Sequence, residues 1–476
     1  MSKPIPFVGS PGQRDTSTTD QRFVNVLFEV EKEASPGQYP VNCIKRPGLS
    51  TSTRPTGGTA VGRGVYYWAG TGNIYSVFDG DIYSNVTKMT STASLSTSTV
   101  AGRVWFAETH QDTGQRKLLI CDGLDNYEVT STNVITQIDQ VDDGQYPTTN
   151  LGSLVFMDGY LFQGQSDGKI WNTDINTTSS WTATSYLTAD TFGGDLEAIH
   201  IQKNQIIAFT KNRIEFFFNN GNPTGSPLLR IDQNTLGFGL AHKNSLASSG
   251  ETACFVSENA ANGDGGRSVY IIASLTKVKE ISNPSLNRLL TAEGLSVSSC
   301  TAWMERVAGQ MVYCLNLALA NRSFVYSVDS GLWKEWANTV STRFNGISAT
   351  SKDGIVYVQD VSSGYIHTLI PSVYQDAGTN FTVMLQTARS NYGSPLRKYA
   401  TELSVIGDTS TGNLGVAVSD DDYASFGTAR NIDMSAQLKR LTRMGAFYSR
   451  AYRFTYTANA PMRLQAYVPE VTVGTG

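Results

Sequence analysis

Histidine and cysteine are scarce in this chain, although most metal sites and disulfide scaffolds need them. None of the four histidines is spaced from another as in a metal-binding HExxH helix. The five cysteines are odd in number and scattered, with no CxxC pair. The sequence therefore predicts buried free thiols rather than a zinc site or a disulfide framework. The cysteines are Cys43, Cys121, Cys254, Cys300 and Cys314.

Charged residues are also sparse. They make up 16% of the 476 residues, below the usual quarter of a soluble domain. Small polar and aromatic residues take their place, which favours strands and turns over exposed helices. The formal net charge of -4 argues against tight wrapping of nucleic acid, because binders of that kind carry a basic excess. It does not argue against a channel through which DNA slides.

Long apolar runs are missing. The residues after Met1 lack the apolar core of about 7–15 residues that a secretory leader needs. No stretch approaches the roughly 20 apolar residues that cross a bilayer. We therefore expect no secretory leader and no membrane-spanning segment, and a protein that is soluble or part of a soluble assembly.

Residues 1–60 predict an extended N-terminal arm. Seven prolines interrupt this segment, and most of it lacks regular periodicity. Residues 22–28 form one short apolar stretch with strand character. Because Phe23, Val24, Leu27 and Phe28 are too apolar for a disordered tail, we expect short strands within the arm.

Residues 61–371 contain an irregular repeat of hairpins, which predicts a β-propeller. Each unit is a strand with alternating apolar residues, a tight turn and a second strand. Asp or Asn at the turns, as at Asp79, Asp167 and Asn321, suits the positive φ that tight hairpins demand. The hairpins recur about every 40–55 residues, roughly the length of a four-stranded blade. Six blades fit best and seven also fit, whereas a two-sheet sandwich leaves the repeat unexplained.

The remaining segments complete an all-β prediction. Asn283 followed by Pro284 predicts the start of a short helix between blades. Residues 372–476 are rich in Arg and Lys, and their alternating segments are spaced as in an antiparallel sandwich. We expect an arm at 1–60, a β-propeller at 61–371 and a C-terminal antiparallel β-sandwich-like domain at 372–476.

Motifs of catalysis are missing as well. The chain has no GxSxG elbow, and we assign no catalytic, cofactor-binding or metal-binding residue. Residues 419–426 resemble the Asp-box turn of sialidase propellers, but Tyr423 replaces its glycine and only one copy is present. We interpret this segment as a hairpin turn with exposed carboxylates. The alternative is calcium binding by Asp420, Asp421 and Asp422.

One basic cluster near the C-terminus is a candidate contact surface. Lys439, Arg440 and Arg443 lie within five residues of one another. Such a cluster can contact DNA phosphates or the acidic rim of a partner. The alternative is a solvated strand edge that charge protects from aggregation.

Several short motifs also occur in an order that resembles a known family. The N-terminal pattern combines Ile5-Pro6 and Gly9 with the sequences RFVN at 22–25 and RPGL at 46–49. Further matches lie at residues 213–217, 267–286 and 324–333. Together, from about residue 5 to 470, these motifs resemble the packaged-DNA-stabilisation proteins of short-tailed phages.

The resemblance implies a tail accessory factor, also called the tail nozzle or tail hub. In that family six copies form a ring below the portal and its adaptor, which continues the DNA channel and helps retain packaged DNA. We therefore expect a virion tail protein, made in the host bacterial cytoplasm, that forms a hexameric ring. Its expected partners are the adaptor ring, tail fibres or tailspikes, and double-stranded DNA in transient passage during ejection.

The family has no catalytic residues to transfer, so the resemblance implies a structural protein and no enzyme. The alternative is a tail-associated propeller that binds or cleaves glycans in host recognition. Cleavage would need a pair of carboxylates near the propeller axis, within reach of a sugar ring.

Overall fold

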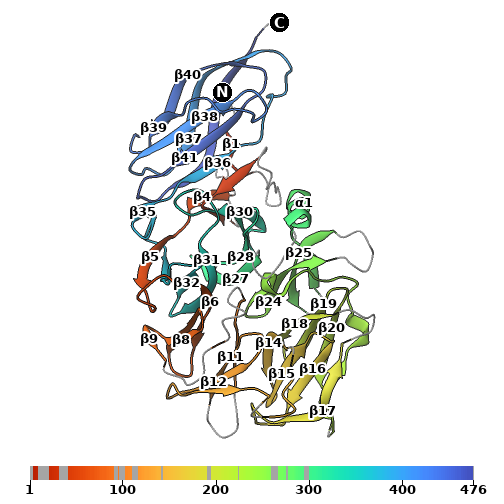
Figure 1. The fold of residues 1–476 in the computed structure, drawn as a ribbon. Coiled ribbons are helices and arrows are strands. Elements are labelled where there is room, and N and C mark those ends of the chain that lie inside the picture. Colours follow the sequence, from red (N-terminus) through yellow and green to blue (C-terminus); the bar gives the residue numbers. More distant parts are fainter. Residues whose placement is uncertain are drawn as a thin grey trace. The chain divides into compact units, whose positions relative to one another are not determined.

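The computed structural model describes residues 4–8, 21–31, 41–89, 95, 102–109, 116–140, 143–148, 150–189, 195–222, 224–258, 266–274, 277–293 and 300–474. Within these residues the chain is mostly strand, and α1 (Pro284–Glu293) is the single α-helix. The chain forms two compact units (Figure 1). The terminal unit comprises Met1–Thr51, Arg306–Asn345 and Thr368–Gly476, and the middle unit comprises Ser52–Glu305 and Gly346–His367.

The middle unit is a series of sheets whose strands follow one another in the sequence. Its first four sheets have four strands each. The first sheet consists of β6 (Gly62–Trp68), β7 (Asn73–Phe78), β8 (Asp81–Ser84) and β9 (Thr87–Lys88), and the second of β10 (Trp105–Glu108), β11 (Lys117–Cys121), β12 (Asn126–Thr130) and β13 (Ile135–Ile138). The third consists of β14 (Asn150–Met157), β15 (Tyr160–Gln165), β16 (Lys169–Thr173) and β17 (Trp181–Thr188). The fourth consists of β18 (Leu196–Gln202), β19 (Gln205–Thr210), β20 (Ile214–Asn219) and β21 (Leu228–Arg230). The fifth sheet holds β22 (Gly239–Leu240), β23 (Ala247–Ser249), β24 (Thr252–Glu258), β25 (Arg267–Ser274) and β26 (Lys277–Glu280). Later in the chain come β27 (Cys300–Val307), β31 (Gly346–Lys352), β32 (Ile355–Asp360) and β33 (Ile366–Ile370).

Neighbouring sheets of the middle unit pack face to face, and the last sheet packs on the first. Separate hydrophobic clusters join the first sheet to the second, the second to the third, and onward to the fifth. Ile366 of β33 shares a cluster with Val65 and Ile74 of the first sheet. The backbone N–H of Val65 also donates to Ser348 Oγ of β31 at 3.3 Å.

The sheets therefore close on themselves as a β-propeller, which confirms the predicted fold class. Closure removes the long exposed edges that an open sheet would present. The segment that opens the unit meets the segment that ends it, because Ala60 and Ser363 form a β-bridge. Arg54 Nε donates to the Ser363 carbonyl at 3.1 Å.

Tight turns join the strands where the sequence predicts hairpins. Asp79 adopts φ 50 between β7 and β8, and Asp353 adopts φ 52 between β31 and β32. Gly168, with φ 92, lies between β15 and β16. Asn, Asp and Gly tolerate the left-handed region better than other residues, so short-range chemistry alone sets these turns. The hairpins predicted at Asp79 and Asp167 are confirmed, and similar hairpins join β19 to β20 and β32 to β33.

Helix α1 begins where the sequence predicts. Asn283 precedes it, and its Oδ1 accepts a hydrogen bond from the backbone N–H of Leu286 at 2.9 Å. Pro284 occupies the first helical position, where the missing N–H is not needed. Leu286 and Leu290 bury one face of the helix.

Replacing Asn283 by alanine is expected to destabilise the middle unit by about 1 kcal/mol, because the N–H of Leu286 loses its capping acceptor. Urea unfolding of the purified chain measures this loss. Asn283→Asp retains an acceptor and serves as the control, with an expected change of a few tenths of a kcal/mol. Equal losses for the two variants would mean that the cap does not stabilise this helix.

The terminal unit contains two large sheets and a two-stranded sheet formed by Gln375–Asp376 and Thr379–Asn380. The first has the order β3-β4-β42-β37-β40, and β1 pairs with β42. The second large sheet has, within this unit, the strand order β28-β29-β30-β2-β36-β41-β38-β39. The strands from the arm are β1 (Ile5–Pro6), β2 (Arg22–Val24), β3 (Val26–Val30) and β4 (Val41–Lys45), followed by β5 (Gly48–Thr53). The others are β28 (Gln310–Leu317), β29 (Arg322–Ser327), β30 (Leu332–Trp336), β34 (Gln375–Asp376), β35 (Thr379–Asn380), β36 (Val383–Gln386), β37 (Lys398–Gly407), β38 (Asn413–Ser419), β39 (Arg430–Asp433), β40 (Arg440–Phe447), β41 (Ala451–Tyr456) and β42 (Arg463–Val473).

Strands of the N-terminal arm are built into both sheets of the terminal unit. β2 lies between β30 and β36, with Phe23 opposite Leu385, and β4 pairs with β42. One hydrophobic core, to which Phe7, Phe28 and Phe454 belong, lies between strands of the two sheets. The arm is thus held by residues more than 300 positions later in the chain. The boundaries near 60 and 371 and the C-terminal sandwich stay predictions.

In the described part of the chain, no helix is both long and apolar enough to cross a membrane.

Candidate functional site

Residues of the middle unit line a cavity of about 380 Å³ within its ring of sheets. Seven strands and their flanking residues form its wall, namely β6, β10, β14, β18, β23, β27 and β31. In a propeller the inner strand of each blade faces the central channel. Seven lining strands agree with the seven-blade alternative, although the number of blades stays a prediction.

One side of the cavity combines stacked aromatic rings with a carboxylate. The rings of Tyr66 and Phe106 stack with their centroids 5.4 Å apart and 12° between their planes. The Tyr66 hydroxyl donates to Glu108 Oε1 at 2.9 Å. Burial raises the pKa of Tyr66, and the charge of Glu108 raises it further, so the phenol keeps its proton. Tyr66 therefore fixes the position of the Glu108 carboxylate.

The wall also contains a guanidinium and an imidazole. The Arg103 guanidinium carbon lies 4.6 Å from the centroid of the Trp105 ring, and its Nη1 donates to the Leu246 carbonyl at 2.8 Å. Burial lowers the pKa of His200 to about 4, and the charge of Arg103 contributes to this shift. His200 is therefore uncharged at neutral pH.

The size of the cavity limits what it can hold. Pockets for small ligands measure about 300–1,000 Å³, and this cavity of about 380 Å³ lies within that range. A DNA duplex, whose major groove alone is about 12 Å wide, does not fit.

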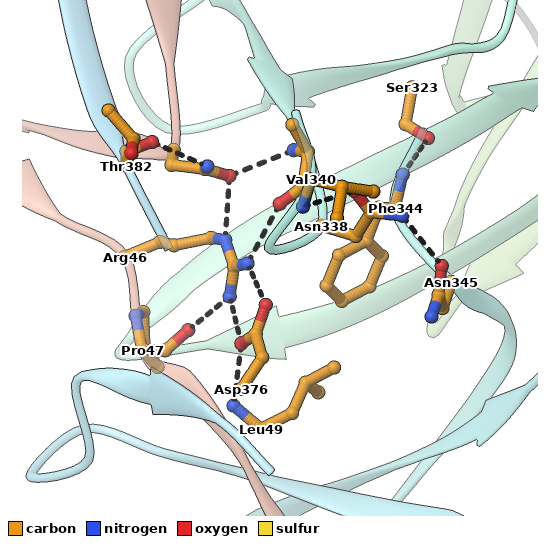
Figure 2. Close-up of polar contacts among 12 residues, drawn as sticks. Arg46, Pro47, Leu49, Ser323, Asn338, Val340, Phe344, Asn345, Asp376 and Thr382 are labelled. Carbon is orange, nitrogen blue, oxygen red and sulfur yellow. Dashed lines mark hydrogen bonds and ion pairs between the residues drawn. The ribbon is translucent and has the colours of Figure 1, made fainter. Parts of the chain in front are cut away.

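A second cluster of functional groups is buried in the terminal unit around Arg46 (Figure 2). Arg46 is 0% exposed, and its two Nη atoms reach Asp376 Oδ1 and Oδ2 at 3.0 and 2.6 Å. Its Nε donates to Asn25 Oδ1 at 2.9 Å. The carbonyls of Pro47 and Ala337 accept its other hydrogen bonds, at 2.9 and 3.0 Å. All of these groups are paired, so the network connects segments distant in sequence and offers no free reactive group, and the loss of one partner would leave the other buried without its counter-charge.

The arm sequences RFVN and RPGL supply the residues of this network. Asn25 adopts φ 59, a conformation that asparagine tolerates, and its Nδ2 donates to the Thr382 carbonyl at 2.8 Å. A Cβ on Gly48 would lie 2.1 Å from the Gln375 carbonyl oxygen, so only glycine fits there. These short motifs thus have a structural explanation.

Arg22 of the RFVN motif belongs to a triad of charges centred on the buried carboxylate of Glu335. Glu335 of β30 forms ion pairs with Arg22 and with Arg322, each at 2.6 Å. Burial by itself would raise the pKa of Glu335, but hydrogen bonds from Arg22 and Arg322 outweigh it and hold that pKa below its ordinary value. The triad connects β2 with β29 and β30 within the terminal unit.

The structure separates the three predicted contact residues. Lys439 is 7% exposed, and its Nζ lies 3.4 Å from Thr409 Oγ1. Arg440 and Arg443 are exposed on β40. Arg440 pairs with Glu402 at 3.0 Å, and Arg443 adopts φ 57. Lys439 therefore lies in the interior, and the contact role of Arg440 and Arg443 stays a prediction.

Each of the three carboxylates of the turn at 420–422 has partners of its own. Asp420 forms an ion pair with Arg450 at 2.7 Å, and Asp422 pairs with Arg389. Asp421 accepts hydrogen bonds from the hydroxyl of Ser419 at 2.8 Å and from the backbone N–H of Ser425 at 3.0 Å. Hydrogen bonds, first from Ser425 and then from Ser419, lower the pKa of Asp421 to about 2.

This arrangement favours the hairpin-turn interpretation over calcium binding. In the residues that the structure describes, no group of three or more His, Cys, Asp or Glu side chains is arranged to hold a metal ion.

The five cysteines are free and buried, as predicted. Burial raises the pKa of each thiol, to about 12 for Cys121 and Cys300. A buried thiol with a raised pKa is a poor nucleophile at neutral pH. Trp333 and Trp336 in β30 are also buried, at 4% and 1% exposed, so they pack in the interior.

Sequence reasoning missed the cavity and the two buried charge networks. The cavity residues come from strands spread between Val65 and Thr350, so no local pattern marks them. A weak signal for the networks exists. Arg22, Asn25 and Arg46 interrupt apolar strand segments, where a polar side chain is costly unless it is paired.

Comparison with solved structures finds distant propellers. Virginiamycin B lyase from Staphylococcus aureus is 11% identical and covers 68% of this chain and 98% of its own, with a TM-score of 0.41. The Pan2 WD40 domain of Neurospora crassa is 10% identical and covers 68% of this chain and 95% of its own, also with a TM-score of 0.41. The N-terminal domain of Nup159 is 10% identical and covers 73% of this chain and 98% of its own, with a TM-score of 0.39.

Comparison with curated proteins gives no match. The family described as "Bacteriophage P22 Gp10, beta-propeller" matches residues 5–374, which include the arm and the closed ring of sheets. The match covers well over half of the chain and agrees with the resemblance carried by the sequence motifs. The chain therefore belongs to this phage stabilisation family of β-propeller proteins.

Proposed function

We propose that this protein is a structural component of a short-tailed phage virion, in the ring that forms the tail nozzle or hub. The observation that carries the proposal is the family match over residues 5–374, which spans the N-terminal arm and the closed propeller. In this proposal the ring continues the DNA channel below the portal and adaptor, retains the packaged DNA and supports its ejection. Tail fibres or tailspikes attach to the same assembly.

The build of the two units supports a structural role. A closed propeller has few free strand edges, so copies can associate through defined faces without open-ended sheet pairing. In the terminal unit, the arm is held by buried ion pairs such as Arg46 with Asp376. Both features suit a rigid subunit of a closed ring with rotational symmetry. The six-fold symmetry itself comes from the family resemblance.

The size of the cavity supports a channel formed by several copies together. Because a duplex does not fit within one propeller, a DNA channel would need surfaces from neighbouring subunits. The net charge of -4 suits passage without retention, since strong neutralisation of phosphates by Lys and Arg produces affinity. We propose that Arg440 and Arg443 contact the adaptor or another tail protein.

The assembly proposal predicts a change of mass that depends on the adaptor. Native mass spectrometry of the purified chain, alone and with the adaptor ring of its own phage, should give six copies of this protein per complete adaptor ring. The double variant Arg440→Glu/Arg443→Glu should weaken this binding, while Arg306→Glu, an exposed control in the same unit, should not. Failure of the wild-type chain to bind the adaptor, or a ring of another symmetry in electron micrographs, would contradict the proposal.

The glycan-binding or glycan-cleaving propeller is the second candidate. One observation favours it, because Glu108 and Glu305 both line the cavity of the middle unit. Retaining glycosidases hold their two carboxyl groups about 5–5.5 Å apart and inverting enzymes about 6.5–9.5 Å apart, with a sugar between them. Incubation with host surface polysaccharide should leave its chain length unchanged if the structural proposal holds, and shortened chains would favour this candidate.

A further inference from the structure

We propose that the cavity of the middle unit binds an organic cation, a primary ammonium group, against Glu108 and the stacked rings of Tyr66 and Phe106. This site lies inside one subunit and does not depend on the proposed ring. The ammonium can come from a free polyamine or from a lysine side chain of another protein. The chemistry is the same in both cases, and the experiment below separates the two sources.

Glu108 is the first observation behind this site. It lies in β10, lines the cavity and is partly buried. Its hydrogen-bond partner, Tyr66, is uncharged. In the part of the chain that the structure describes, no cationic side chain lies within ion-pair distance of the Glu108 carboxylate. A partly buried carboxylate favours a nearby positive charge more strongly than an exposed one does, because less water screens it.

The aromatic rings are the second observation. Phe106 and Glu108 are two positions apart on β10 and therefore lie on the same face of the strand. Tyr66 joins them, since its ring stacks on Phe106 and its hydroxyl binds Glu108. Aromatic faces attract cations within about 6 Å of the ring centroid, and more strongly where water is excluded. A carboxylate beside two rings is the combination that recognises ammonium groups.

The rest of the wall fits this assignment. The cavity already holds one cation against an aromatic face, because the Arg103 guanidinium lies over Trp105. His200 is neutral at pH 7, so it adds no positive charge. The charged side chains of the wall are Arg103, Glu108 and Glu305, which sum to a formal charge of -1. Phosphate or another anion would face this net negative charge, whereas an ammonium group would neutralise it.

The volume of the cavity also agrees with a small cation. A cavity of about 380 Å³ holds a linear diamine or the end of a lysine side chain, and it lies within the usual range for small-molecule pockets. Trp105 and Trp303 line the same cavity, which supplies an intrinsic reporter. Binding next to these indoles should change the fluorescence of the protein.

The test is a titration of the full-length chain with putrescine, with N-acetyl-lysine methylamide and with glucose, each followed by tryptophan fluorescence and calorimetry. We expect saturable binding of at least one amine up to about 10 mM, the millimolar range of weak specific sites, and no binding of glucose. Putrescine alone binding would identify a free polyamine as the source. Binding of the lysine derivative alone would identify a protein side chain, and binding of both would identify the ammonium group itself as the feature recognised.

Matched variants connect the binding to the site. Glu108→Gln preserves shape and removes the charge, so the affinity for the amine should fall about tenfold. Tyr66→Phe removes the hydroxyl that positions Glu108, and the affinity should fall about threefold even if Glu108→Gln does not fold. Glu251→Gln, at an exposed carboxylate that pairs with Lys203, is the control and should leave affinity unchanged.

Three results would overturn the proposal. One is the absence of binding by either amine to the folded wild-type chain. The second is glucose binding as tightly as the amines, which would assign the cavity to sugars. The third is an affinity of folded Tyr66→Phe or Glu108→Gln equal to that of the wild type.

Discussion

Replacing Arg46 by alanine is expected to lower the free energy of unfolding of the terminal unit by about 3–5 kcal/mol, because the change leaves the carboxylate of Asp376 buried without its cation. Arg46 also packs on an aromatic ring, with its guanidinium carbon 3.9 Å from the centroid of Phe381. Its hydrogen bonds reach β34, the residue after β30 and the turn between β2 and β3. One substitution therefore loosens several segments that are distant in sequence.

Urea unfolding followed by tryptophan fluorescence measures this effect. Trp336 is a suitable reporter, since its ring centroid lies 5.8 Å from the Arg46 guanidinium carbon. Arg46→Lys keeps the charge but loses the two-pronged contact, so an intermediate loss is expected. The matched control is Arg463→Ala, because Arg463 is partly exposed and pairs with Glu29 and Glu31. An exposed pair of this kind contributes about 0–1 kcal/mol.

A loss for Arg46→Ala no greater than that for Arg463→Ala would contradict the argument. The double variant Arg46→Ala/Asp376→Ala separates the pair from its surroundings. If Arg46→Ala destabilises the unit mainly because it leaves the carboxylate unpaired, the double variant should lose less free energy of unfolding than the sum of the losses of the two single variants.

Replacing Lys334 by methionine is expected to stabilise the terminal unit at pH 6–7, by a free energy on the order of 4 kcal/mol. Lys334 is 2% exposed, and its Nζ has no hydrogen-bond partner among the described residues. The ring centroid of Phe28 lies 5.6 Å from that nitrogen. Burial lowers the pKa of Lys334 to about 7, while the charge of Asp329 opposes this shift. Methionine fills a similar space without a charge to bury.

The sign follows from proton binding. An unfolded lysine has a pKa of about 10.4, so between pH 7 and pH 10.4 the unfolded chain carries a proton at Lys334 that the folded chain lacks. The stability of the wild type therefore rises with pH across this window and is lowest below pH 7. Each unit of difference between the folded and unfolded pKa corresponds to about 1.4 kcal/mol, and the difference between about 7 and about 10.4 gives the expected stabilisation on the order of 4 kcal/mol. The advantage of Lys334→Met should vanish near pH 10.4.

Urea unfolding at pH 6, 8 and 10 measures the difference between wild type and variant. Arg306→Met, at an exposed position of the same unit, controls for the effect of adding methionine. A stability difference that stays constant across this pH range would show that Lys334 is not buried with a lowered pKa. A variant less stable than the wild type at pH 6 would contradict the prediction outright.

The propeller hairpins were accessible to sequence reasoning because their determinants are local. Asp79 and Gly168 suit turns that need positive φ, and the flanking strands alternate apolar and polar residues. The cap of α1 at Asn283 follows from the same short-range chemistry. The family resemblance rested on motifs in the arm that the structure explains through Arg22, Asn25 and Arg46.

The candidate site could not be predicted in this way. Tyr66 and Glu108 lie 42 residues apart on different sheets, and the packing of the first sheet on the second brings them together. The cluster at 439–443 shows a second limit of local sequence. Charge groups Lys439, Arg440 and Arg443 as one candidate contact surface, but Lys439 is buried while Arg440 and Arg443 are exposed, and the contact role stays a prediction.

The sequence by itself determined the elements of this protein: an all-β chain, its hairpins, its short helix and its free thiols. These depend on turn conformations and on the alternation of apolar side chains, which act between near neighbours. Only the tertiary structure decided which strands share a sheet, so that β2 lies between β30 and β36. It also decided which charges are buried, because Arg46 meets Asp376 across 330 residues. Pairing over such distances depends on the whole packed core, and no local pattern encodes it.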